Sequence, residues 1–105
     1  MQPKPQFWKL DTAIQIQPDA VVSRTLINLK NGTVTLFSFD HEQGLSEHTT
    51  PYDALVQIVD GSMNITVSGE TYLVNAGEMI LMPANQPHAL QALSPTRMLL
   101  IMIHS

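Results

Sequence analysis

Apolar residues in this chain recur at every second position or in short unbroken runs, and no segment keeps a helical period of 3.6 residues. Alternation is typical of strands that bury one face, and a continuous apolar run indicates a strand that is covered on both faces. Turn residues such as Gly, Pro and Asn separate the runs. The pattern predicts an all-β fold with strands at 13–17, 21–29, 33–40, 54–60, 63–68, 71–74, 79–82, 88–92 and 97–104.

Residues 41–51 form the one long stretch without strand periodicity, and this stretch contains His41, Glu42, Glu47 and His48. Long loops of compact β-domains often carry function, although a solvated connection is the commoner case. We therefore consider the polar residues of this stretch as candidates for a site.

The last strand is apolar on both faces from Met98 to Ile103. Such a strand needs cover from a second sheet, from a terminal segment or from a partner subunit, and this need favours a homodimer. Phe7 and Trp8 lie in an otherwise polar start, where they are expected to cap a hydrophobic edge of their own barrel or of a dimer partner.

The length of 105 residues predicts one domain, which we expect to comprise an N-terminal arm at 1–12 and a β-barrel at 13–105. The chain has no cysteine, so disulfides, thiolate metal sites and thiol nucleophiles are excluded. A net charge of −4 with 5 Lys and Arg argues against binding to nucleic acid or to a membrane surface. The polar start lacks the apolar core of a secretory signal, and a cytoplasmic location is expected.

Two segments carry a more specific signal. One runs from His48 to Gly61 (HTTPYDALVQIVDG) and the other from Gly77 to His88 (GEMILMPANQPH). Together they resemble the two conserved motifs of the cupin family: a histidine strand ending in a glycine turn, and a later frame of Gly, Pro and His. The resemblance implies a single-domain jelly roll, also described as a double-stranded β-helix barrel, which is often dimeric and has its pocket inside the barrel mouth.

The chain departs from the family pattern at the metal ligands. A cupin of the full metal-binding type has a second His two positions after the first, a Glu four positions later, and a closing His in the second motif. These places hold His48, Thr50, Ala54 and His88 here, so two of four ligands remain. The expected second-motif Gly is Asn85, which also accepts a left-handed backbone.

Strand alternation gives the expected composition of the pocket. If His48 points into the barrel, Thr50, Ala54 and Val56 share its face, whereas Glu47, Asp53 and Gln57 point away. The predicted ligand-binding pocket consists of His48, Thr50, Tyr52, His88, Ala54, Val56 and Met79.

Two imidazoles fall short of the three protein ligands of catalytic zinc, or of the two His and one carboxylate of non-haem iron. His41, Glu42 or Glu47 would complete the set only if their loop folds inward. We therefore expect either no cofactor or a divalent transition metal (Zn, Ni, Mn or Fe) held by His48 and His88.

The leading functional hypothesis is a cupin that binds a small organic molecule in its barrel pocket. The alternative is a metal-dependent or His-based cupin enzyme of the dioxygenase, isomerase or lyase type. A purely structural role is the third possibility. The sequence assigns no catalytic residue, ligand or partner protein, because the fold supports many chemistries.

Overall fold

The described part of the chain, residues 4–104 of the computed structural model, contains nine strands and no helix. All-β architecture is thereby confirmed. The strands are β1 (Val21–Leu29), β2 (Gly32–Phe39), β3 (Gly44–His48), β4 (Asp53–Asp60), β5 (Ser62–Val67), β6 (Glu70–Asn75), β7 (Met79–Met82), β8 (His88–Ala92) and β9 (Thr96–Ile103). No helix in residues 4–104 is long and apolar enough to cross a membrane.

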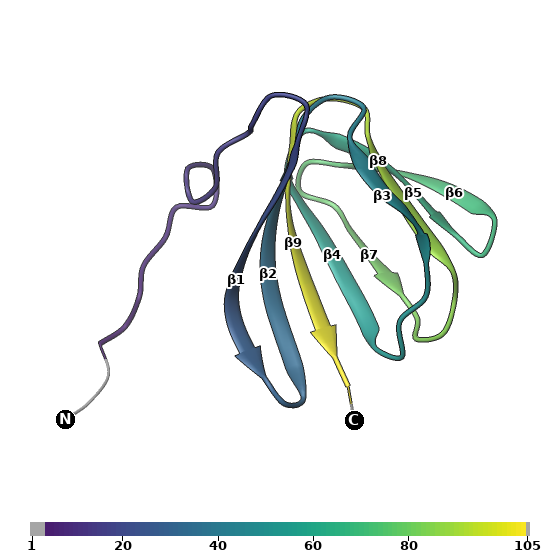
Figure 1. Ribbon diagram of the computed structural model, residues 1–105, viewed down its shortest axis with the longest axis horizontal. Coiled ribbons are helices and arrows are strands. Elements are labelled where there is room, and N and C mark those ends of the chain that lie inside the picture. Colours follow the sequence, from purple (N-terminus) through teal and green to yellow (C-terminus); the bar gives the residue numbers. More distant parts are fainter. Residues whose placement is uncertain (1–3, 105) are drawn as a thin grey trace.

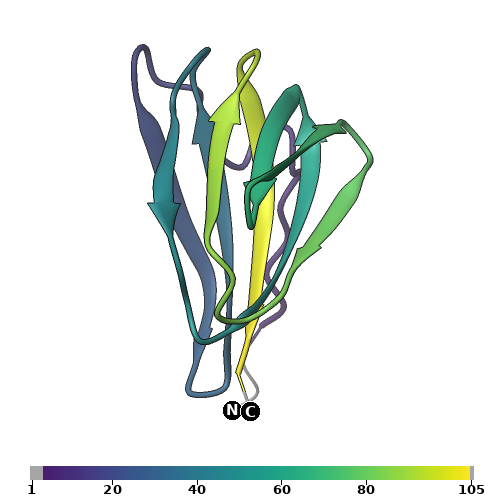
Figure 2. The ribbon, with the colours of Figure 1, turned by 90° about the vertical axis from the view of Figure 1, so that its right-hand side faces the viewer.

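The strands form two antiparallel sheets that share one core (Figures 1 and 2). The larger sheet has the order β1-β2-β9-β4-β7, and the smaller sheet has the order β3-β8-β5-β6. Neighbours in each sheet are mostly distant in the chain, as is expected for the jelly roll that the sequence predicts.

Strand alternation builds the core between the sheets. Ala54, Val56 and Ile58 of β4 are at most 1% exposed, while their neighbours along the strand are half-buried or exposed on the opposite face. The smaller sheet contributes in the same way, through the buried residues Met63, Ile65, Val67, Val74, Leu90 and Ala92. The inner faces of both sheets therefore meet as one apolar layer.

Three connections lie together at one end of the sandwich, the lower end in Figure 1, which we call the mouth. They are the β1–β2 turn at 30–31, the β3–β4 loop at 49–52 and the β7–β8 loop at 83–87. The backbone N–H of Asn85 donates to the carbonyl of Thr50 at 2.8 Å and joins the last two loops. Asn85 has a φ of 66°, so the left-handed backbone expected at this position is confirmed.

Residues 13–17 form no strand, which corrects the sequence-based prediction. This segment crosses the outer face of the larger sheet, where side chains bind its carbonyl groups: Ser38 donates to Gln15 at 2.7 Å, and Arg97 donates to Ile14 at 2.8 Å. Ile14 is 6% exposed as a result. Alternating apolar residues indicate only that one face of a segment is buried. Residues 13–17 meet this condition through hydrogen bonds from side chains, without pairing to a neighbouring strand.

The irregular loop predicted at 41–51 contains β3, which is the second correction. β3 pairs with β8 and carries a bulge between Leu45 and His48. Leu45 is its one residue that packs against the core, so the strand has no apolar alternation to detect. Gly44 is required at its start because a Cβ there would collide with the carbonyl oxygen of Leu90.

The predicted boundary between an arm at 1–12 and a barrel at 13–105 stays a prediction. Residues 1–3 of that arm and Ser105 of that barrel lie outside the described residues. Trp8, within the arm, packs under the guanidinium of Arg24, which lies 5.5 Å from the ring centroid, whereas Phe7 is 87% exposed.

Arg97 holds the N-terminal segment to the larger sheet and supplies the first testable prediction. Its guanidinium contacts Asp60 Oδ2 at 3.0 Å and the Ile14 carbonyl at 2.8 Å. We expect Arg97→Met to lower the free energy of unfolding by about 1–3 kcal/mol, because Asp60 and the Ile14 carbonyl lose the guanidinium donors. Urea denaturation measures this loss. Lys9→Met, a change at an exposed residue, is the control, and equal stability of the two variants would contradict the prediction.

Candidate functional site

Two histidines meet at the mouth, although 40 residues separate them in the chain. His48 ends β3, His88 begins β8, and the two are cross-strand partners. Their Nε2 atoms lie 3.0 Å apart, and the rings meet edge to face with centroids 4.3 Å apart. His88 is 5% exposed, whereas His48 is exposed, so one ring is accessible from solvent and the other lies behind it.

The three contacts of the His pair need one proton more than two neutral imidazole rings carry. His48 Nδ1 lies 2.7 Å from the Ser46 carbonyl oxygen, and His88 Nδ1 lies 3.2 Å from that of Gln86. A carbonyl only accepts, so each Nδ1 must carry a proton. Two neutral imidazoles then have no proton left for the contact between their Nε2 atoms. The pair needs one further proton, or a donor from outside, to satisfy all three contacts.

Burial decides which ring stays neutral. Desolvation is the largest influence on the pKa of His88 and lowers it below its usual value, the bond to Gln86 acts in the opposite direction, and a positive charge on His48 lowers it further. His88 is therefore the ring that resists protonation, and its Nε2 acts as a hydrogen-bond acceptor.

The remaining residues of the sequence-based pocket lie at different depths. The Thr50 hydroxyl donates to the Tyr52 carbonyl at 3.3 Å, which holds the β3–β4 loop. Ala54 and Val56 are buried in the core, at 1% and 0% exposure. Met79 is 63% exposed on the outer face of β7, because Ile80 and Met82 take the inner positions. The assignment of Met79 to the pocket is therefore corrected, because Ile80 and Met82 are the residues of β7 that face the core.

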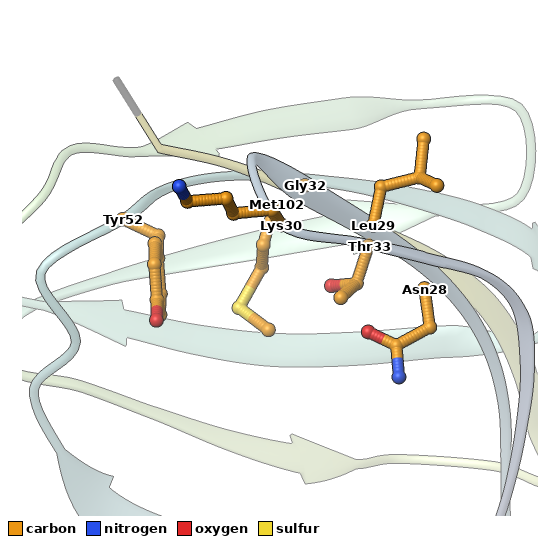
Figure 3. A pocket seen from close by; sticks show the side chains of 7 residues that line it. All are labelled: Asn28, Leu29, Lys30, Gly32, Thr33, Tyr52 and Met102. Carbon is orange, nitrogen blue, oxygen red and sulfur yellow. The ribbon is translucent and has the colours of Figure 1, made fainter.

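A cavity of about 250 Å³ opens beside Tyr52 at the mouth (Figure 3). It lies between the β1–β2 hairpin and the β3–β4 loop, and its lining residues are Asn28, Leu29, Lys30, Gly32, Thr33, Tyr52 and Met102. Of these, Tyr52 alone belongs to the pocket predicted from the sequence. Thr33 pairs with Met102, and Met102 pairs with Ala54, so the cavity continues the row in which Ala54 lies.

His104 is a further mouth residue that the sequence analysis missed. Its ring packs edge-on against Tyr52 with centroids 4.9 Å apart, and its backbone N–H donates to the Asn31 carbonyl at 2.9 Å. Only the pairing of β9 with β2 and β4 brings it there, and that pairing cannot be read from the local sequence.

The donor set does not fit a metal centre of three protein ligands. No group of three or more His, Asp or Glu side chains with suitable geometry exists within residues 4–104. Glu42 donates its N–H to the Ala92 carbonyl at the far end of β3. Six residues separate it from His48, a strand length of roughly 20 Å. His41 is next to Glu42, so neither residue completes the set as the loop hypothesis required.

Comparison with known proteins identifies the family. The cupin domain family model matches residues 35–104, and the chain belongs to the cupin family. A conserved protein of unknown function from Streptococcus pyogenes, SPY1581, is 36% identical, with 99% of this chain and 91% of that chain covered and a TM-score of 0.92. A cupin 2 conserved barrel domain protein from Leptotrichia buccalis is 34% identical over 91% of this chain and 47% of that chain, with a TM-score of 0.87.

A cupin superfamily protein from Desulfitobacterium hafniense, DSY2733, shows the same fold at 24% identity, with 98% and 94% of the two chains covered and a TM-score of 0.91. No curated protein matches the chain. Cupins often bind metals and small ligands, so membership of the family does not by itself give the function of this mouth.

The lowered pKa of His88 predicts that acid destabilises the fold. Unfolded His88 binds a proton near its usual pKa of 6.5, and the folded residue binds it only at lower pH. The unfolded state therefore holds more protons below about pH 6.5, and the free energy of unfolding falls as the pH drops further. We expect His88→Gln to reduce this fall between pH 7 and 5 in urea denaturation. His41→Gln should leave it unchanged, and a His88→Gln profile parallel to that of the wild type would refute the assignment.

Proposed function

We propose that this cupin binds a small organic molecule at its mouth, where His48 and His88 provide the polar contact. The observation that carries the proposal is the approach of the two Nε2 atoms to 3.0 Å while both Nδ1 atoms face carbonyl oxygens. Thr50 and Tyr52 belong to the loop beside the pair, and Ala54 and Val56 form the apolar layer beneath it.

A hydrogen-bond donor on the ligand can supply the proton that the neutral His pair lacks. A hydroxyl or ammonium placed over the two rings directs a proton at their Nε2 lone pairs, and both Nδ1 bonds are kept. His48 is exposed, so a ligand reaches the pair from the solvent side. The buried His88 loses little by this contact, because its ring is already desolvated.

A His-based enzyme is the second candidate, and the neutral ring of His88 favours it over a metal-dependent one. The lowered pKa of His88 keeps its Nε2 available as a proton acceptor 3.0 Å from a second imidazole, and a neutral imidazole is a common general base. A metal-dependent reaction would need ligands beyond the His pair, and residues 4–104 supply no third His, Asp or Glu in place.

The binding hypothesis is tested by thermal stabilisation with a metabolite library. A ligand present at 100 times its Kd stabilises the native state by about 2.7 kcal/mol. We expect His48→Ala to weaken the binding of the library hits about ten-fold, because a hydrogen bond to the ligand is lost. The variant should fold, since His48 is exposed, and far-ultraviolet circular dichroism checks this.

His41→Ala is the matched control, because His41 is also exposed and lies at the opposite end of β3. The hits should stabilise it as they stabilise the wild type. Hits that stabilise His48→Ala and His88→Gln as strongly as the wild type would refute a site at the His pair.

We also propose that two copies of the chain associate through the outer face of the larger sheet. Ile27, Leu29 and Ile103 are 49%, 69% and 63% exposed on this face, and with Val34 and Ile101 they line a groove of about 330 Å³. The outer face of the smaller sheet has the exposed Leu73 but is otherwise more polar, with the Thr66 and Thr71 hydroxyls bonded to each other at 2.8 Å.

Within residues 4–104, cover of this apolar face is seen near the end opposite the mouth, where Ser38 and Arg97 hold the carbonyl groups of Gln15 and Ile14. The apolar residues of the mouth half are exposed in the described part of the chain. In a two-fold interface the same patch meets itself, so an uncharged apolar patch is self-complementary. A second copy is therefore the occupant that this face fits.

The dimer is tested by light scattering after size exclusion. Ile103→Lys places a charge on the exposed apolar face and should convert a dimer to a monomer, because a buried charge without a partner opposes association. Gln91→Lys on the exposed outer face of β8 is the control and should leave the mass unchanged. A monomeric wild type, or a dimeric Ile103→Lys, would contradict the proposed interface.

A further inference from the structure

Positively charged and titratable groups gather at the mouth of a chain whose net charge is −4. His48 and His88 lie in the smaller sheet, and His104 packs on Tyr52 at the end of β9. Lys30, one of only 5 Lys and Arg residues, is in the β1–β2 turn and lines the cavity beside Tyr52. Three of the chain's 4 histidines and one lysine thus lie at the mouth, and of these Lys30 alone lines the cavity.

The cavity lining has the chemistry of an anion site with an apolar side. Its polar side-chain groups are the Lys30 ammonium, the Asn28 amide and the hydroxyls of Thr33 and Tyr52, and no lining residue carries a carboxylate. Figure 3 shows the Lys30 amine reaching toward Tyr52, with Met102 and Thr33 between Tyr52 and Asn28. The nearby Asp53 occupies the opposite face of β4 from the buried Ala54 and accepts the Ala84 N–H at 2.9 Å.

Thr33 is a second feature of the cavity lining that favours a ligand. Its hydroxyl oxygen is the one buried side-chain polar atom within residues 4–104 that has no hydrogen-bond partner. An unpaired buried hydroxyl lowers stability, and native proteins rarely retain one without a reason. A change of χ1 would be needed to direct this hydroxyl at a ligand oxygen in the cavity.

We propose that this cavity binds a small organic acid, with its carboxylate at the Lys30 ammonium and the rest of the acid along Met102 toward Thr33 and Asn28. This inference rests on the proposed function, since it gives the acidic part of a ligand whose hydroxyl or ammonium group meets the His pair. The volume of about 250 Å³ is below the usual range for drug-sized ligands, so the acid is small.

Matched acids and amides test the charge preference, because they differ little in shape. Benzoate with benzamide, and butyrate with butyramide, are titrated into the isotope-labelled full chain while backbone amide signals are followed by NMR. We expect the acids to shift the signals of Lys30 and Thr33 and to bind at least five-fold more tightly than their amides. Lys30→Met should weaken the acids about five-fold and leave the amides unchanged, as loss of an exposed ion pair predicts. Lys9→Met, an exposed residue of the N-terminal segment, is the control and should bind as the wild type does.

Thr33→Val separates a binding role from a packing role. The substitution removes the unpaired hydroxyl and keeps the shape, so the melting temperature of the free protein should rise while acid binding weakens. Thr25→Val, at an exposed position of the neighbouring strand β1, should change neither the melting temperature nor the binding of the acids. A Thr33→Val protein that melts lower, or that binds benzoate as the wild type does, would overturn the role given to Thr33.

Acids that bind no more tightly than their amides, an absence of binding by all four probes, or unchanged acid binding in Lys30→Met would each overturn the inference. The proposed function is judged separately, by the response of library hits to His48→Ala. Neutral hits that depend on His48 would support a mouth site while refuting the acid preference. Acid binding at Lys30 together with hits whose binding does not depend on His48 would support the acid preference and refute the site at the His pair.

Discussion

Alternation of side chains along each strand is the constraint on which the rest of this structure depends. It places Ala54, Val56 and Ile58 in the core and leaves Asp53 on the opposite face of β4. The same rule turns Met82 inward and Met79 outward on β7. The phase of each strand decides which side chains face the core and the mouth, because a side chain one position out of phase lies on the other side of the sheet.

The sequence predicts the features that alternation and turn chemistry encode, and it fails where register across distant strands decides. Eight of the observed strands overlap predicted ones, and Asn85 has the left-handed backbone expected of it. β3 escaped detection because it packs one residue, Leu45, against the core. The cavity escaped because Thr33 joins Tyr52 through the pairing of β2 with β9 and of β9 with β4, and no local pattern encodes that pairing.

The His pair shows how loss of metal ligands changes the chemistry of a site without removing it. Ala54 offers no donor atom, and Thr50 uses its hydroxyl on the Tyr52 carbonyl. The two remaining imidazoles then face each other directly, each fixed by a carbonyl oxygen at Nδ1. Coordination of a metal would satisfy the two lone pairs, but so would a proton or a ligand donor, and these need no further protein ligands.

The proposed ligand site and the proposed dimer face are not independent, because the β1–β2 hairpin belongs to both. Leu29, Thr33 and Met102 line the mouth cavity and also the groove on the outer face. Association of a second copy on that groove would fix the hairpin that carries Lys30 and would reduce the conformational freedom lost on binding. Linkage is reciprocal, so a ligand that orders the hairpin must strengthen the dimer by the same free energy by which the dimer strengthens the ligand. If both proposals hold, the affinity of the mouth would be set partly from the opposite side of the sheet.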